Sequence, residues 1–439
     1  MQFRPFSLSP VLPLAVIAIA MTSCIAPPKT PKVTDAQRAE WAKVKTGKFA
    51  WGVSTSSYQY ENPDLKPTDE FSTDWDVLIA DGAAPKKGNA VWSWSDWDKD
   101  LVAIKKLGLT HYRFSVEWGR IEPQPGVYDE EVLARYVSWA KRLKANGVEP
   151  VVCLWHFTFP DWLYDKKHPA KSNWLHPQFS GRWKAFTKKV VAAMGPTVRF
   201  YAPQNEPNGQ ITTAYIGGMW PPMEAMNFGN YNRAIKVSAQ AFRDAAAIIK
   251  QENPRALVLS VEALPWWKKP PFVWTWFYNF MEHNNFDHLD QVYDVCDVIG
   301  FNYYYSQTAG PVSMLLIGSH HGPNFTEMGW DIDPNGLYEQ IRTVGARYGK
   351  PMMITENGIA TADDKQRIKY LQEHLAAIAK AKAGGSDVRG YFHWSLADNY
   401  EWHFGYTATF GLSHMDPKTK DRILKPSALY YRDIIRIHK

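Results

Sequence analysis

The sequence predicts an α/β protein built as a single (β/α)8 barrel of the TIM type. From about Phe49 onward, strand-like runs alternate with helix-like runs, and the strand-like runs are almost continuously apolar. Such runs are typical of a parallel sheet that is buried on both faces. About eight units follow one another, with polar residues where the strands end, and this pattern favours a closed barrel. A doubly wound open sheet is the alternative, but no Gly-x-Gly-x-x-Gly or phosphate-loop sequence supports it.

The elements can be placed in order along the chain. The expected strands lie at 49–53, 111–116, 150–154, 198–201, 256–261, 297–301, 352–356 and 388–394. The expected helices lie at 98–107, 129–146, 182–194, 231–251, 337–348 and 366–383. In the second of these helices Val132, Tyr136 and Leu143 share one face, and Gly147 can end the helix.

Composition excludes several classes of function. The chain has 439 residues, of which 21% are charged and 45% hydrophobic, as in ordinary globular proteins. The net charge is +6, but no dense Lys/Arg block accompanies it, so we expect a solvated surface and no nucleic-acid partner. Cys153 and Cys296 are expected to be small buried side chains. His283 and His288 lack a third ligand at a suitable spacing, so we expect no metal, and no cofactor is implied.

The first 24 residues are interpreted as a targeting segment. Arg4 provides a basic start, and the apolar run that follows is too short for a comfortable membrane span. Small residues precede Cys24, which resembles a bacterial lipoprotein signal in which Cys24 becomes the lipidated terminus. An ordinary cleaved signal and an anchor helix are the alternatives.

The segment after Cys24 separates this leader from the barrel. Residues 25–44 form a Pro-rich tether and residues 45–439 form the barrel domain. We therefore expect an exported protein, periplasmic or at the cell surface, that contacts a membrane only through its lipid. Because Ile25 rather than Asp follows Cys24, the outer membrane is favoured in a Gram-negative host.

Two short segments place a glutamate at the end of a strand-like run. They are Asn205-Glu206-Pro207 and Thr355-Glu356-Asn357-Gly358. Carboxylates at the carboxyl ends of barrel strands meet at the open face, where barrel enzymes assemble their sites. Such a pair can cleave a glycosidic bond, because one protonates the leaving oxygen and the other attacks the sugar or activates water. Either segment alone could be a helix cap or a turn.

The chain resembles family 1 of the glycoside hydrolases, the β-glucosidase family. Seven segments match this family in its order, at 49–59, 112–115, 154–156, 205–207, 302–304, 354–358 and 394–410. The resemblance covers nearly all of the chain after the leader, and seven motifs in order are highly specific. It implies a barrel enzyme that removes a terminal β-linked sugar with retention of configuration.

The resemblance also assigns the catalytic roles. By motif, Glu206 is the general acid/base and Glu356 is the nucleophile, with Arg113 and Tyr304 beside Glu356. A nearby cation and a hydrogen bond should keep a nucleophilic carboxylate ionised. Partial desolvation should instead raise the pKa of Glu206 so that it holds a proton. A retaining enzyme needs about 5–5.5 Å between the two carboxyl groups.

Sugar recognition is expected from polar and aromatic side chains, since hydroxyl groups need donors and acceptors in fixed directions. By motif these residues are Gln59, His156, Asn205, Asn302, Trp394, Glu401, Trp402 and Phe410. Glu401-Trp402 is intact and no Ser/Lys/Tyr phosphate clamp follows, which in this family indicates an unphosphorylated sugar. We expect a β-glucosidase that acts on a β-glycoside or an oligosaccharide. The exact glycone, the leaving group and the oligomeric state stay open.

Two other functions fit the same barrel. A non-catalytic sugar-binding protein typically loses one of the paired carboxylates, whereas this chain keeps both; a transglycosylase cannot be separated from a hydrolase by sequence. Three positions depart from the family pattern: Asn62, the segment Ala202-Pro203-Gln204, and Thr409. Trp266, Trp267, Trp274 and Trp276 cluster after the fifth strand, where they could line the entrance or pack under a loop.

Overall fold

The computed structural model describes residues 43–63, 71–270, 274–310 and 322–438, together with Thr34 and Gln37. The expected leader 1–24, its Cys24 and nearly all of the tether lie outside these residues. None of the helices in the described ranges is long and apolar enough to cross a membrane.

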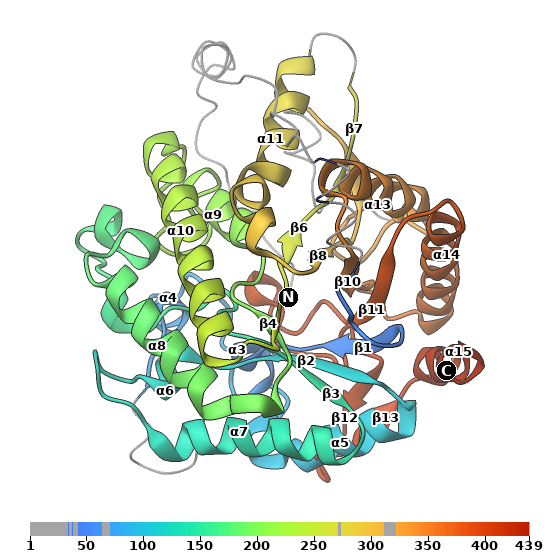
Figure 1. Cartoon of the computed structure of the whole chain (residues 1–439), viewed down its shortest axis with the longest axis horizontal. Coiled ribbons are helices and arrows are strands. Elements are labelled where there is room, and N and C mark those ends of the chain that lie inside the picture. The colour runs from blue at the N-terminus through green and yellow to red at the C-terminus, as the bar shows by residue number, and fades with distance from the viewer. Residues whose placement is uncertain are drawn as a thin grey trace.

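A parallel sheet curls around the centre of the molecule (Figure 1). Its hydrogen-bonded order is β5-β4-β3-β2-β1-β11-β10-β8-β6. These strands are β1 (Ala50–Ser54), β2 (His111–Ser115), β3 (Glu149–Cys153), β4 (Phe200–Ala202), β5 (Leu257–Val258), β6 (Glu262–Ala263), β8 (Ile299–Asn302), β10 (Met352–Asn357) and β11 (Val388–Trp394).

The two ends of this sheet are joined by one stretch of chain, which closes the barrel. β5 pairs with β4, whereas β6 pairs with β8, and only a few residues separate β5 from β6. Leu259, between them, bridges to Val298. Counted as one strand, β5 and β6 reduce the nine strands of the sheet to eight. The expected strand at 256–261 therefore covers β5 and the interruption but ends just before β6, and the predicted (β/α)8 barrel is confirmed.

Helices surround the barrel on its outer side (Figure 1). The longer ones are α5 (Ser93–Leu107), α7 (Glu130–Ala145), α8 (Phe179–Met194), α9 (Pro207–Tyr215), α10 (Phe228–Glu252), α11 (Thr275–Val292), α13 (Pro334–Tyr348), α14 (Asp364–Ala383) and α15 (Pro426–His438). The sequence pattern predicted six of these within a few residues and missed α9, α11 and α15. α7 begins as expected for a capped helix, because Asp129 accepts hydrogen bonds from the backbone N–H groups of Glu131 and Val132.

Two smaller sheets and three short α-helices accompany the barrel, together with single-turn 3-10 helices. An antiparallel pair, β12 (Ser413–Met415) and β13 (Arg422–Leu424), precedes α15, and a parallel pair, β7 (Trp266–Lys268) and β9 (Ser306–Thr308), follows the barrel strands β6 and β8. The short helices are α3 (Ser57–Tyr60), α4 (Asp74–Ala80) and α6 (Trp118–Ile121).

The barrel interior is filled in layers, as barrels of this type require. An apolar layer is contributed by residues all around the sheet: Ala50, Val151, Phe200, Leu257, Leu259, Val298, Met353 and Phe392. A second, smaller cluster consists of Cys153, Ala202 and Val261. Both Cys153 and Cys296 are buried free thiols. Each residue of the second cluster comes later on its strand than the first layer does, so the polar residues that follow it stand at the carboxyl ends.

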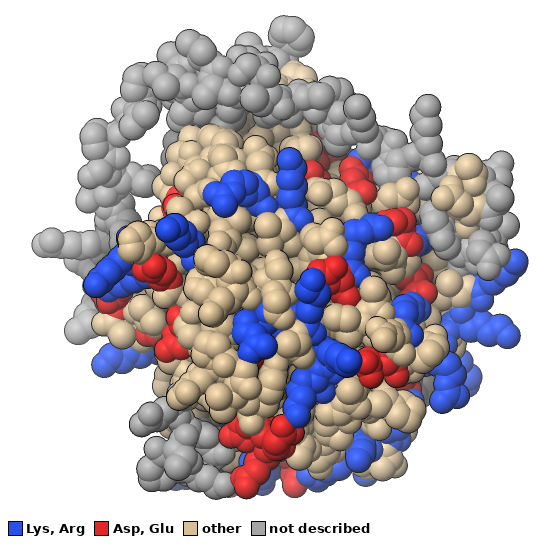
Figure 2. All heavy atoms as spheres, turned by 60° about the vertical axis from the view of Figure 1, so that its left-hand side comes forward, with Lys and Arg blue, Asp and Glu red and all other residues tan. Residues whose placement is uncertain are grey.

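The outer surface is mixed in charge. On the face that the left side of Figure 1 presents, basic and acidic side chains lie interspersed (Figure 2). Lys184 on α8 and Asp244 on α10 are 3.7 Å apart, and Arg243 lies 2.6 Å from Asp294. Exposed pairs of this kind contribute roughly 0–1 kcal/mol each, so they solvate the surface rather than hold the fold.

Candidate active site

The two glutamates singled out by sequence lie at the same end of the barrel. Glu206 follows β4 and caps the amino end of α9, whereas Glu356 lies near the carboxyl end of β10. Asn302, at the carboxyl end of β8, reaches both strand ends: its Nδ2 donates to Glu206 Oε1 over 2.7 Å, and its Oδ1 accepts from Thr355 Oγ1 over 2.7 Å. One polar cluster therefore contains both carboxyl groups.

Glu356 is held by strong donors. Arg113 on β2 donates from Nη1 to Glu356 Oε1, and the Tyr304 hydroxyl donates to Glu356 Oε2 over 2.5 Å. The side chains of Arg113 and Glu356 are 0% and 4% exposed. Burial raises the pKa of Glu356, whereas the charge of Arg113 and the hydrogen bonds from Tyr304 and Arg113 oppose that rise. Burial remains the largest influence, and the donors around this carboxyl group limit the rise of its pKa.

Glu206 has a different setting. Asn302 is its side-chain donor, and no cation forms an ion pair with it among the described residues. Burial, followed by the negative charge of Glu356, raises the pKa of Glu206 to about 8. Its backbone has φ 43° and ψ 50°, a left-handed conformation that non-glycine residues adopt rarely. Glu206 is thus a carboxylic acid that keeps its proton at neutral pH.

Asn205 and His156 extend this network. Asn205 Oδ1 accepts from Arg113 Nη2 over 2.5 Å, which orients the amide so that its Nδ2 donates to His156 Nε2 over 3.3 Å. The proton of His156 is therefore on Nδ1, which is buried and has no partner in the part of the chain described. Burial and the charge of Arg113 lower the pKa of His156, so the ring is neutral. Its Nδ1–H is a buried donor without a partner among the described residues.

Gln59 and Glu401 form a second polar group. Gln59 Nε2 lies 2.9 Å from the Tyr400 carbonyl oxygen and 3.3 Å from Glu401 Oε2. Burial, followed by the charge of Glu356, raises the pKa of Glu401 to about 8. The charge of Glu206 acts on Glu401 in the same direction, so this carboxyl group lies within electrostatic reach of both catalytic candidates.

Aromatic rings surround these polar groups. Trp394 lies almost parallel to His156, with ring centroids 5.9 Å apart, and Trp402 stacks on Tyr58 at 5.7 Å. Phe410 is only 1% exposed and packs against Tyr304 with centroids 5.8 Å apart. The structure thus places Phe410 behind Tyr304, where it supports the donor to Glu356.

Packing, one of the two roles left open by sequence, applies to the tryptophans after β6 to different extents. Trp267 is 4% exposed and packs with Phe277, Phe280 and Met281. Trp266, Trp274 and Trp276 are only partly buried. Packing therefore accounts for Trp267.

Sequence reasoning missed a second aromatic pair, Tyr305 and Trp330, whose rings stack with centroids 4.9 Å apart. Burial, followed by the charge of Glu206, raises the pKa of Tyr305, so this pair lies near the acid/base candidate.

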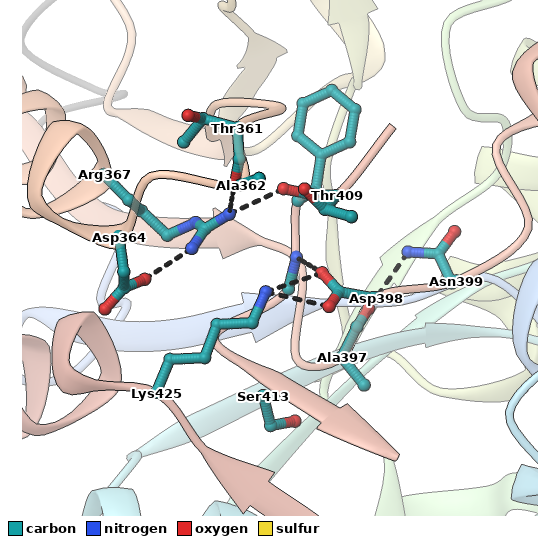
Figure 3. Close-up of polar contacts among 12 residues, drawn as sticks. Thr361, Ala362, Asp364, Arg367, Ala397, Asp398, Asn399, Thr409, Ser413 and Lys425 are labelled. Atoms are coloured by element: carbon teal, nitrogen blue, oxygen red, sulfur yellow. Dashed lines mark hydrogen bonds and ion pairs between the residues drawn. The ribbon is translucent and has the colours of Figure 1, made fainter. Parts of the chain in front are cut away.

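The loop that carries Glu401 and Trp402 is fixed at both ends (Figure 3). Before it, Asp398 accepts from Lys425 Nζ over 2.8 Å and from the backbone N–H of Gly411 over 2.8 Å. After it, Arg367 on α14 donates to the carbonyl oxygens of Thr361 and Thr409. Arg367 thus brings a cation to the position where Thr409 departs from the family pattern.

A glycine allows the last two strands to approach. A Cβ atom on Gly358, just past β10, would collide with the Trp394 carbonyl oxygen on β11. The Gly of Thr355-Glu356-Asn357-Gly358 is therefore required by close packing, and this packing places Glu356 beside β11.

All twelve predicted catalytic and substrate-binding residues lie within the described ranges. Hydrogen bonds join one group of them into a network: Glu206, Glu356, Arg113, Tyr304, Asn205, Asn302 and His156. Gln59 and Glu401 form a separate hydrogen-bonded pair, and Trp402 stacks on Tyr58. Sequence reasoning missed Tyr305, Trp330, Arg367 and Lys425. Within the described ranges no group of three or more His, Cys, Asp or Glu side chains could hold a metal ion.

Paired carboxyl groups in unequal settings at the open end of a barrel are the arrangement that glycoside hydrolases use. The family model described as "Glycosyl hydrolase family 1" matches residues 43–270 and 277–439, so the chain belongs to this family.

Relatives in several organisms agree with this assignment. The chain is 27% identical to "Beta-glucosidase A" of Thermotoga maritima, over 88% of this chain and 97% of the relative. It is 28% identical to a "Bifunctional beta-D-glucosidase/beta-D-fucosidase" of Bifidobacterium breve, over 89% and 98%. Among solved structures, a β-glycosidase from Pyrococcus horikoshii superposes with a TM-score of 0.78 at 29% identity, over 89% and 94% of the two chains.

Proposed function

We propose that this protein is a retaining exo-β-glycosidase that hydrolyses terminal, unphosphorylated β-linked sugars, with β-glucosides as its main substrates. The observation that carries the proposal is the unequal setting of the two glutamates. Glu356 receives donors from Arg113 and Tyr304, whereas Glu206 is a protonated acid with a pKa of about 8. A double displacement needs this pair: one carboxylate that attacks and one acid that protonates.

In the first step Glu356 attacks the anomeric carbon. The bond from that carbon to the leaving oxygen breaks, Glu206 gives its proton to the oxygen, and a covalent glycosyl–enzyme ester forms. Arg113 and Tyr304 keep the attacking oxygens of Glu356 ionised and oriented. The leaving alcohol departs neutral.

In the second step water replaces the leaving group. Glu206, now ionised, takes a proton from the water molecule while the oxygen of the water attacks the anomeric carbon. The ester bond from that carbon to Glu356 then breaks. Two inversions restore the original β configuration, and both glutamates return to their starting protonation.

The sugar itself would be read by the second polar group. Glu401 and Gln59 offer an acceptor and a donor close together, His156 offers Nδ1–H, and Trp394 offers a ring face. Support for a glucose-type sugar comes from the relatives, whose names include β-glucosidases, a β-D-fucosidase activity and a β-galactosidase of Sulfolobus acidocaldarius.

Azide separates the roles of the two glutamates, because it attacks without a general base. With dinitrophenyl β-glucoside, whose leaving group needs no proton, Glu206→Ala should show a burst followed by slow turnover. Azide should accelerate that turnover and yield the β-glucosyl azide. Glu356→Ala forms no ester, so azide should attack directly and yield the α-anomer. The anomers are assigned by NMR of the product; the same anomer from both variants would refute the division of roles, and exchanged anomers would reverse it.

We also propose that the protein is exported and lipid-anchored through Cys24, facing the periplasm or the cell exterior. The supporting observations are the short apolar run before Cys24 and the Pro-rich segment after it. Cys24→Ser should move the protein from the membrane fraction to the soluble fraction when cells are fractionated. Retention in the membrane with an uncleaved leader would indicate an anchor helix instead.

A further inference from the structure

Gln204 breaks the family pattern just before the acid/base residue, and the structure gives it a partner. Its side chain is fully buried and contacts α10 outside the barrel strands. Nε2 donates to the Ser238 carbonyl oxygen over 3.1 Å, and Oε1 accepts from the Ser238 hydroxyl over 2.9 Å. A position that is commonly apolar in this family thus carries an amide held by two hydrogen bonds.

The contacts continue from Ser238 to the next strand. Ser238 Oγ lies 3.3 Å from His288 Nε2 on α11, and His288 Nδ1 lies 2.8 Å from Glu262 Oε1 on β6. All four side chains have 0% exposure. We call Gln204, Ser238, His288 and Glu262 the buried relay.

The directions of these hydrogen bonds follow from the backbone. The Ser238 carbonyl can only accept, so it fixes the amide of Gln204 with Oε1 toward the Ser238 hydroxyl. The Ser238 hydroxyl donates its only proton to Gln204 Oε1, so in its contact with His288 the hydroxyl oxygen accepts from Nε2–H. His288 thereby links Ser238 to Glu262 through its two ring nitrogens.

The same strand segment also holds the backbone around Glu206. The Glu206 N–H donates to the Val261 carbonyl oxygen over 2.7 Å. Asn208 brackets Ala263, accepting from its N–H over 3.0 Å and donating to its carbonyl oxygen over 2.8 Å. Glu206, with its left-handed backbone, thus lies between two fixed points, Gln204 and Asn208.

We propose that the buried relay is a positioning device for the acid/base residue: Glu262 and His288 lock Ser238 and Gln204, and thereby hold the strained turn at Glu206 in the orientation that protonates the leaving oxygen. This inference rests on the proposed function. It makes Gln204, Ser238, His288 and Glu262 positioning residues, since none of them contacts the reacting atoms.

An electrostatic observation agrees with this geometry. After burial and the charge of Glu356, the charge of Glu262 is among the causes that raise the pKa of Glu206. One oxygen of Glu262, Oε2, has no hydrogen-bond partner in the described residues, so its charge is not dispersed by a second donor. The relay thus lies close enough to Glu206 to act on it.

The test compares substrates that need the acid with substrates that do not. In Glu262→Gln and in Ser238→Ala, kcat/KM for cellobiose should fall about 10- to 100-fold, because a misplaced acid protonates the leaving oxygen poorly. The value for dinitrophenyl β-glucoside should stay within about threefold of wild type, because its leaving group needs no proton. His288→Gln, which offers Ser238 a donor without help from Glu262, should restore part of the loss when added to Glu262→Gln.

Asp100→Asn provides the matched control. Asp100 forms an equally buried ion pair with Arg422, 2.6 Å apart, between α5 and β13 and away from the site. This variant should lower the melting temperature without separating the two substrates. Equal losses on both substrates in Glu262→Gln and Ser238→Ala, or no loss in either, would overturn the relay. Ser238→Ala removes a single oxygen, so it keeps the test available if Glu262→Gln does not fold. Absence of hydrolysis by the wild type would instead refute the proposed function.

Discussion

The carboxyl end of β10 and the carboxyl end of β4 present the same functional group in opposite settings. At β10, Glu356 meets the Arg113 guanidinium and the Tyr304 hydroxyl. At β4, Glu206 meets an amide, and its pKa rises to about 8. The difference shows that burial alone does not assign a role: both carboxyl groups are surrounded by protein, and the donors around each decide which one ionises.

The comparison would break most clearly at Arg113. Arg113→Met leaves Glu356 buried without its cation, and breaking such a pair should cost about 3–5 kcal/mol of stability. Because the charge of Arg113 lowers the pKa of Glu356, its loss should move the acidic limb of the kcat/KM profile to higher pH. Thermal unfolding and the pH–rate profile measure the two effects. Arg113→Lys, which keeps the charge, should shift the limb less; an unmoved limb in Arg113→Met would contradict the role of this cation.

A smaller effect is expected from the sugar-binding side. Glu401→Ala removes a buried acceptor that Gln59 orients, which should cost about 1–3 kcal/mol in kcat/KM for a β-glucoside. Part of the loss should appear in kcat, because such contacts tighten in the transition state. Glu327→Gln is the control, since Glu327 is an exposed carboxylate that bonds Thr409 near the same loop. Unchanged kcat/KM in Glu401→Ala would show that the sugar pocket is assigned wrongly.

The smallest change needs no substitution. Glu206 must be protonated to act as an acid, and its pKa is about 8. Above that pH, kcat/KM for cellobiose should fall about tenfold per pH unit. For dinitrophenyl β-glucoside the same limb should be much flatter, because the first step then needs no acid. Profiles of the two substrates measured side by side would contradict the assignment if their alkaline limbs coincided.

Most of the barrel could be read from the sequence because its strands are continuous apolar runs and its helices are amphipathic. The interruption between β5 and β6 could not, since the run 256–261 carries no break signal. α15 and the pair β12–β13 were missed because they lie beyond the last expected strand.

The candidate site residues could be proposed from the sequence because each belongs to a short motif on or after a barrel strand. Tyr305, Trp330 and Arg367 were not, because their contacts are made between segments far apart in the chain. The contacts of His288 could not be predicted from the sequence for the same reason. Sequence spacing excluded a metal there, but only the fold brings Glu262 and Ser238 to its ring.

The first described residues of the barrel domain lie at the end of the barrel opposite the catalytic carboxyl groups. β1 runs from Ala50 toward the catalytic end, so residues 43–49 enter at the opposite end. Two arginines near the starts of β4 and β11 hold residues 43–49 at this end. Arg199 donates to the Lys45 carbonyl oxygen, and Arg389 donates to the Val44 carbonyl oxygen. If the protein is anchored through its N-terminal segment, the anchor would therefore be attached at the end of the barrel opposite the catalytic carboxyl groups. The candidate active site would then face away from the attachment point, toward sugars that arrive by diffusion.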